Sequence, residues 1–341
     1  MNRKGVCYDV GRVIAGENQH PDFDAQIARR ELEIIRRDLN CNAVRICGQD
    51  VERVIVAAEI ALDLGLETWL SPEPWGQELS EELDYLATAS RAAEAVRHKA
   101  PGRVVLSVGT EATLFMRGIL PHGTVIDLMR NPVRFAWTMR RLKAGAYHAP
   151  LNHFLPQASS VARSVFHGPI TYASAPIEAV DWTLFDIISI DYYRGKKNRN
   201  TYGQRLDRYR TVGKPVVVTE VGCCTYQGAE DKGGRGFFIF DRRYPGEDRI
   251  KPGYVRDEEL QAREVSDMLT VLDTAGVDGA FVFVFSSPTL VHRADPLRDF
   301  DLGSYSLVTT LPDGAHGTTY PDLPWEPKQS FHAVADTYDA T

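Results

Sequence analysis

Residues 104–111 have the sequence VVLSVGTE, and residues 215–220 have the sequence PVVVTE. Each is a short apolar run that ends in a glutamate. Runs of this length, bounded by Gly or Pro, are typical of strands that are buried on both faces, as in a parallel sheet. We therefore expect Glu111 and Glu220 at the carboxyl ends of two parallel strands, the edge at which α/β enzymes place their catalytic side chains.

Strand-like and helix-like segments alternate along the whole chain. The expected strands are residues 5–10, 42–48, 66–70, 103–108, 170–173, 186–193, 216–219 and 279–285. The clearest expected helices are residues 22–39, 51–64, 80–98 and 132–166, the last broken near Ala149 and Pro150. This alternation predicts a single (β/α)8 TIM barrel over residues 1–341. A doubly wound two-domain fold is disfavoured, because no linker divides the chain and no G-x-G-x-x-G follows the first strand.

Two connections in this pattern are unusually long. They follow the seventh and eighth strands, at residues 222–253 and 286–325, and both are rich in Gly, Pro, Asp and aromatic residues. Long structured loops on the active edge of a barrel are usually functional.

Composition restricts the partners and the location. The chain has 341 residues, 43% hydrophobic, and a net charge of -7, which disfavours a nucleic-acid partner or an anionic membrane. The five cysteines show no C-x-x-C spacing, so we expect reduced thiols, no metal site and no cofactor. Strand-like sequence begins at about Gly5 and no apolar stretch approaches about 18 residues, so we expect no signal peptide, no membrane span and a cytoplasmic location.

The two glutamates are suited to glycoside cleavage. A general acid must hold a proton near neutral pH while a nucleophile stays ionised, so the two carboxyls need different environments. Arg45 and Tyr192 are the expected donors that keep Glu220 charged, which leaves Glu111 as the group that binds a proton. Two such carboxyls on one edge of a barrel can act as nucleophile and acid/base.

The chain resembles the clan A glycoside hydrolases, a barrel superfamily that contains cellulases, mannanases and β-galactosidases. In that family the acid/base ends strand four and the nucleophile ends strand seven, which correspond to Glu111 and Glu220. Arg45 matches the family's strand-two Arg, and Tyr192 or Tyr193 matches its strand-six Tyr. The closing segments, residues 304–308 and 325–335, are similar to the family's run into the last helix.

Two positions depart from the family pattern. Thr110 stands where the family usually has Asn, and Phe283 or Phe285 stands where it has the strand-eight Trp. Both positions belong to the subsite in which the resemblance would place a sugar. The expected substrate-binding residues are Asp9, Arg45, Trp75, Thr110, Tyr192 and Phe285.

The sequence thus predicts an enzyme that cleaves or transfers the glycosidic bond of a small glycoside or oligosaccharide with retention. Glu220 is the expected nucleophile and Glu111 the expected acid/base. Two alternatives stay open, because a fold does not fix a reaction. The same barrel and acids could act on an apolar, cation-forming metabolite that is not a sugar, or the chain could be a binding protein without catalysis.

Overall fold

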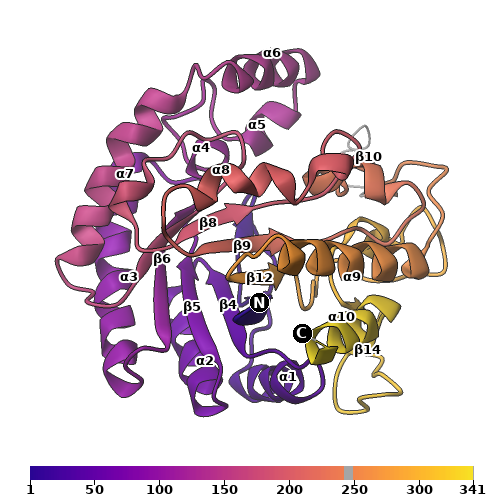
Figure 1. The fold of residues 1–341 in the computed structure, drawn as a ribbon. Coiled ribbons are helices and arrows are strands. Elements are labelled where there is room, and N and C mark those ends of the chain that lie inside the picture. The colour runs from indigo at the N-terminus through magenta and orange to yellow at the C-terminus, as the bar shows by residue number, and fades with distance from the viewer. Residues whose placement is uncertain (242–248, 341) are drawn as a thin grey trace.

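The computed structural model describes residues 1–241 and 249–340, and eight parallel strands close into a barrel (Figure 1). The barrel strands are β1 (Arg3–Asp9), β4 (Ala43–Gly48), β5 (Glu67–Pro72), β6 (Val104–Thr110), β7 (Ile170–Ser174), β8 (Ile188–Asp191), β9 (Val216–Val221) and β12 (Gly279–Val282). Each strand pairs with the next one along the chain, and β12 pairs with β1. The predicted (β/α)8 barrel is confirmed.

The barrel interior is packed with side chains. A cluster of buried residues draws on six of the eight strands, which only the interior can bring together. Trp69 and Phe281 are its largest members, and their ring centroids are 5.1 Å apart. The cluster forms a floor beneath the carboxyl ends of the strands.

The helices that surround the barrel, of which the first three begin and end close to the expected residues, are ten in the described part of the chain. They are α1 (Ala25–Arg37), α2 (Val51–Asp63), α3 (Leu79–Lys99), α4 (Ala112–Phe115), α5 (Val125–Met129), α6 (Pro132–Lys143), α7 (His148–Arg163), α8 (Asp207–Arg210), α9 (Glu258–Thr274) and α10 (Gln329–Ala340). Asp24 caps α1 by accepting two amide hydrogens with its side chain. Gly65 follows α2 at φ 85°, a left-handed conformation that glycine adopts without strain.

One predicted helix boundary is wrong. The break near Ala149 and Pro150 lies instead between α6 and α7, at residues 144–147. Gly145 has φ 82° there, which interrupts the helix. Pro150 is in the first turn of α7, where a missing N–H costs no intrahelical hydrogen bond.

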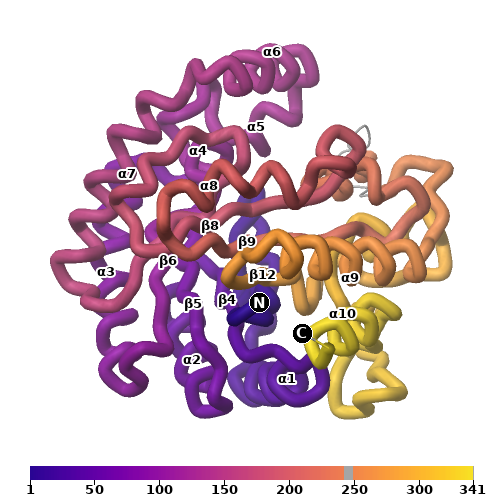
Figure 2. The backbone as a smooth tube through the Cα atoms, in the orientation of Figure 1, coloured from indigo at the N-terminus to yellow at the C-terminus, as the bar shows by residue number. Residues whose placement is uncertain are grey.

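The long connections after β9 and β12 each contain a small antiparallel sheet. These sheets are β10–β11 (Phe240–Asp241 with Arg249–Ile250) and β13–β14 (Val308–Thr310 with Trp325–Pro327), and a third, β2–β3 (Val13–Ile14 with Glu17–Asn18), follows β1. Residues 242–248 of the first predicted loop lie outside the described residues. The two chain ends meet beneath the barrel (Figure 2), since the Tyr338 hydroxyl donates to the Gly5 carbonyl at 2.8 Å. None of the helices described is long and apolar enough to cross a membrane.

Candidate active site

Arg45 organises the carboxyl end of the barrel. It projects from β4 and is fully buried, and its two terminal nitrogens face opposite sides of the site. Nη1 donates to Glu220 Oε1 at 2.9 Å, while Nη2 donates to Glu73 Oε1 at 2.9 Å and to Thr110 Oγ1 at 2.8 Å. The guanidinium therefore fixes side chains from the ends of three other strands, β5, β6 and β9, as its rigid fork of donors permits.

Glu220, on β9, receives a donor on each carboxylate oxygen. Arg45 donates to Oε1, and the Tyr193 hydroxyl donates to Oε2 at 2.8 Å. Hydrogen bonds from both sides stabilise the ionised form of a carboxyl. They also fix the direction of the Glu220 carboxylate at the end of the barrel.

Glu111 has the opposite environment. Within the described part of the chain its carboxyl makes no hydrogen bond, and the residue is half-buried. Burial raises the pKa of Glu111 well above its ordinary value, and the nearby carboxylates of Asp191, Glu220 and Glu178 raise it further. Burial and neighbouring negative charge therefore both favour the protonated form of Glu111, and no partner in the described part of the protein competes for its proton.

The backbone at Glu111 is held in an unusual conformation. Its φ is 44°, in the left-handed region that non-glycine residues seldom occupy. The Glu111 amide donates to the Ala173 carbonyl at 2.8 Å, and the next amide, of Ala112, donates to the Tyr172 hydroxyl at 2.7 Å. These bonds from β7 determine where the turn after β6 places the glutamate side chain.

Glu178, an acid in the connection after β7, also holds the turn that carries Glu111. Glu178 accepts hydrogen bonds from the Thr113 amide at 3.0 Å, the Tyr172 hydroxyl at 2.9 Å and the Ala175 amide at 2.9 Å. Glu178 and Tyr172 thus connect the end of β7 to the turn that carries Glu111.

Asp191 lies on β8 beside Glu220, with which it is in register. It is 1% exposed, and neither of its carboxyl oxygens has a hydrogen-bond partner among the described residues. Burial raises the pKa of Asp191 well above its ordinary value, and the charge on Glu220 adds to the effect. This setting favours the neutral form of Asp191, which does not repel Glu220.

Three of the expected substrate-binding residues are at the site but already have partners in the protein. Thr110 accepts from Arg45 and donates to Glu73 at 3.1 Å. Asp9 accepts from the Arg12 Nε at 2.7 Å and from two amides of its own turn. The Trp75 ring stacks on Phe115 at 4.0 Å between centroids, which covers one of its faces.

Two expected residues are not at the site, and residues one or two positions away take their places. The Tyr192 hydroxyl donates to the Tyr202 carbonyl, and the rings of these two residues stack. The contact with Glu220 that was predicted for Tyr192 is made by Tyr193. Phe285 is fully buried against Tyr8 and Trp325, outside the site.

Phe283 faces the site in place of Phe285. Its ring centroid is 6.4 Å from that of Tyr193, which bonds Glu220, and 6.0 Å from that of Tyr305. The Arg12 guanidinium lies 4.7 Å from the Phe283 ring and 5.4 Å from the Trp75 ring. The wall of the site is therefore aromatic, with one buried cation between two rings.

Arg12, Glu73, Tyr172 and Glu178 are site residues that sequence reasoning missed. Arg12 stands three residues after the acid that ends β1, and this spacing is its only signal. Glu178 lies in the connection after β7, four residues past the strand, and its sequence context gives no signal.

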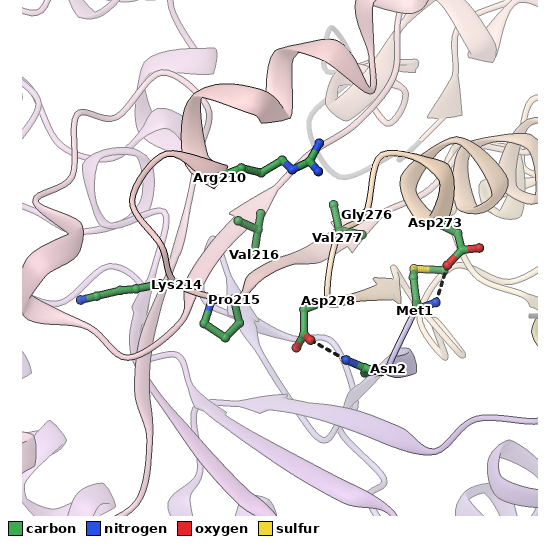
Figure 3. Close-up of a pocket in the computed structure, with 10 residues that line it drawn as sticks. All are labelled: Met1, Asn2, Arg210, Lys214, Pro215, Val216, Asp273, Gly276, Val277 and Asp278. Atoms are coloured by element: carbon green, nitrogen blue, oxygen red, sulfur yellow. Dashed lines mark hydrogen bonds and ion pairs between the residues drawn. The ribbon is translucent and has the colours of Figure 1, made fainter.

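A separate hollow opens at the opposite, amino-terminal end of β9 and β12 (Figure 3), with a volume of about 490 Å³. Its charged groups are already paired: the Met1 amine with Asp273, Asn2 with Asp278, and the Lys214 amine with backbone carbonyls. It has no oriented acid pair among its described residues, so the carboxyl end of the barrel is the better candidate for the active site.

The arrangement defines a class of site in chemical terms. One carboxylate, Glu220, is oriented by two donors, and a second carboxyl, Glu111, has a raised pKa and no hydrogen-bond partner among the described residues. Both stand at the carboxyl end of a parallel barrel, one at the end of the fourth strand and one on the seventh. Such a pair can supply a nucleophile and a proton donor to one bond.

Comparison with solved structures places the chain among barrels of known fold. It matches a GH113 β-mannanase from Alicyclobacillus acidocaldarius at 16% identity and TM-score 0.58, over 99% of this chain and 97% of that one. An endo-1,4-β-D-mannanase from Thermotoga petrophila matches at 11% identity and TM-score 0.54, over the whole of both chains. A β-glucuronidase from Bacteroides uniformis matches at 15% identity and TM-score 0.54, over 91% of this chain and 33% of that one.

The chain therefore has the fold of these glycoside hydrolases, as its resemblance to clan A implied. No family model matches the sequence, and no curated protein matches it. The likeness is one of architecture, so the activity has to be argued from the site.

Proposed function

We propose that the protein is a glycoside hydrolase that cleaves a small glycoside or oligosaccharide with retention of configuration. The observation that carries this proposal is the contrast between the two glutamates. Glu220 receives donors on both oxygens, and Glu111 receives none from the described residues and has a raised pKa. Nucleophile and acid/base need these two environments.

The proposed reaction has two steps. Glu220 attacks the anomeric carbon as the bond to the leaving oxygen breaks, and the Glu111 proton passes to that oxygen. Glu111, now ionised, then takes a proton from a water molecule that attacks the same carbon, and Glu220 departs as a carboxylate. Arg45 and Tyr193 stabilise Glu220 before and after the covalent intermediate.

The sugars to test first are those named for the structural neighbours. They are β-mannosides and β-glucuronides, offered as aryl glycosides so that release is coloured. A mechanism-based inhibitor with a cyclophellitol-type aziridine, in the matching configurations, should label Glu220, and digestion with mass spectrometry locates the adduct. Anomeric NMR of the first product distinguishes retention from inversion. Labelling of another residue, or an inverted product, would contradict the proposal.

One observation favours a second candidate, in which the ligand is apolar and not a sugar. Thr110 and Asp9 have their polar atoms bonded within the protein, and the rings of Phe283 and Trp75 lie against Arg12. In that case the acid pair would stabilise a different cation or transfer a proton. Failure of every aryl glycoside and of every inhibitor configuration, with a folded protein, would support this candidate over the first.

A further inference from the structure

The charges of the chain are distributed very unevenly. Residues 128–177 contain no Asp or Glu, although the whole chain has 46 acids and a net charge of -7. Five of the basic residues in this acid-free stretch lie in or just before α6: Arg130, Arg134, Arg140, Arg141 and Lys143. All five are exposed, and none of them forms an ion pair with any residue the structure describes. Uncompensated charge at this density produces a local positive potential on an acidic protein.

The same face of α6 exposes two large apolar side chains. Val133 is 79% exposed and Trp137 is 49% exposed, and their spacing of four residues puts them on one side of the helix. The Arg141 guanidinium lies 4.9 Å from the Trp137 ring, so cation and ring form one unit. We call the seven exposed residues the basic aromatic face: Arg130, Val133, Arg134, Trp137, Arg140, Arg141 and Lys143.

The opposite side of α6 is anchored. Leu142 is fully buried in a satellite core with Leu120 and Leu128, and Phe135 and Met139 pack against that core. The basic aromatic face is therefore carried by a fixed helix. The apolar side of α6 is already buried, so the exposure of Val133 and Trp137 does not result from a helix that lacks a core. In Figure 1, α6 stands at the outer margin of the molecule with α5 and α4 beneath it.

This helix is carried by a connection that starts at the candidate active site. The connection that contains it begins with Glu111 at the end of β6. Its Phe135 ring is 6.1 Å from that of Phe238, which belongs to the connection that follows Glu220. The face thus lies on the loop that continues from Glu111, and the other side of α6 contacts the loop that continues from Glu220. A glycan longer than the cleaved unit could extend along these loops.

We propose that the basic aromatic face binds an anionic glycan, a chain whose sugars bear carboxylate or sulfate groups. Sugar rings stack on Trp137, and the arginines bind the acidic groups, for which the guanidinium fork is suited. The identity of the partner as a glycan rests on the proposed function. A membrane fits less well, because two apolar side chains among five cations make a narrow surface for insertion.

The test measures binding of the full chain to polygalacturonate, with a neutral β-mannan of similar length as comparison, at low and high salt. We expect salt-sensitive binding to polygalacturonate alone. Arg140→Ala with Arg141→Ala should weaken it at least about tenfold, because two charge-assisted contacts are lost. Trp137→Ala should weaken it independently. The matched control is Lys99→Ala with Arg263→Ala, exposed cations on α3 and α9 that should leave binding unchanged.

Three results would overturn the proposal. They are absence of binding to polygalacturonate, binding that the α6 variants do not weaken, and stronger α6-dependent binding to anionic phospholipid vesicles or duplex DNA. Aryl glycoside cleavage separates this inference from the proposed function. If no aryl glycoside is cleaved but polygalacturonate binds through α6, the face stands and the catalytic proposal falls. If aryl glycosides are cleaved and polygalacturonate does not bind, the catalytic proposal stands and the proposal for the basic aromatic face falls.

Discussion

The Tyr172 hydroxyl donates to Glu178 Oε1 at 2.9 Å and accepts the Ala112 amide hydrogen at 2.7 Å. Through this pair a side chain of β7 and an acid beyond it hold the backbone turn that gives Glu111 its left-handed conformation. Neither residue needs to touch a substrate, so both are positioning residues.

Replacing Tyr172 by Phe should therefore reduce catalysis through geometry. A buried amide loses its acceptor, which costs about 1–3 kcal/mol of stability, and kcat should fall at least about tenfold with little change in KM. Tyr338→Phe is the matched control, because its buried hydroxyl bonds the Gly5 carbonyl at the far end of the barrel. It should lose similar stability in thermal unfolding and keep its kcat. Equal losses of kcat in both variants would contradict a positioning role.

The two glutamates should respond differently to the leaving group. Glu220→Gln should lower kcat/KM at least about a thousandfold for every aryl glycoside, because no covalent intermediate can form. Glu111→Gln should lower kcat/KM strongly only for substrates with poor leaving groups, since a phenol of low pKa departs without a proton. A plot of log kcat/KM against leaving-group pKa should be steep for Glu111→Gln and shallow for the wild type. Near-normal turnover by Glu220→Gln would end the assignment.

Replacing Arg45, even by another cation, should reduce both activity and stability. Arg45→Lys keeps the charge but cannot serve Glu220, Glu73 and Thr110 together, because an ammonium lacks the planar fork. Breaking a buried pair costs about 3–5 kcal/mol, so a large fall in midpoint temperature should accompany the loss of activity. Arg163→Lys is the control, since its pair with Asp186 is exposed and should cost less than about 1 kcal/mol.

The sequence predicted the strands correctly, but it did not identify every side chain of the site. The apolar runs predicted all eight strands, and the acids at two of their ends located the site, because parallel strands bring their carboxyl ends together. Tyr192 and Tyr193 could not be distinguished in this way. A register shift between β8 and β9 next to Asp191 decides which tyrosine faces Glu220.

The same limit applies to the eighth strand. Alternation along residues 279–285 puts Phe281, Phe283 and Phe285 on one face, yet β12 ends at Val282. Beyond that end alternation no longer holds, so Phe283 lies in the site and Phe285 lies in the outer core. The role of Arg12 depends on a turn after β1 that bends it back over Asp9, and no periodic pattern encodes that turn.

The raised pKa of Glu111 makes both stability and activity depend on pH. A carboxyl whose pKa is higher in the folded state binds its proton more tightly there than in the unfolded chain. The folded protein therefore loses stability as pH rises from the pKa of the unfolded chain, near 4.3, to that of the folded state. The loss is about 1.4 kcal/mol for each pH unit that separates the two values. Below the pKa of the unfolded chain the group has no effect.

Glu111→Gln removes that titration. The variant should be more stable than the wild type at pH 7 to 8, and the difference should vanish near pH 4, as measured by urea unfolding across this range. Activity should also depend on this group. Wild-type kcat/KM requires protonated Glu111, so it should fall as pH rises through the pKa of Glu111. Asp191→Asn should move that alkaline fall to lower pH, because it removes the charge that Asp191 gains as pH rises, the largest cause of the raised pKa after burial. A stability difference that is independent of pH would show that Glu111 is not held protonated by the fold.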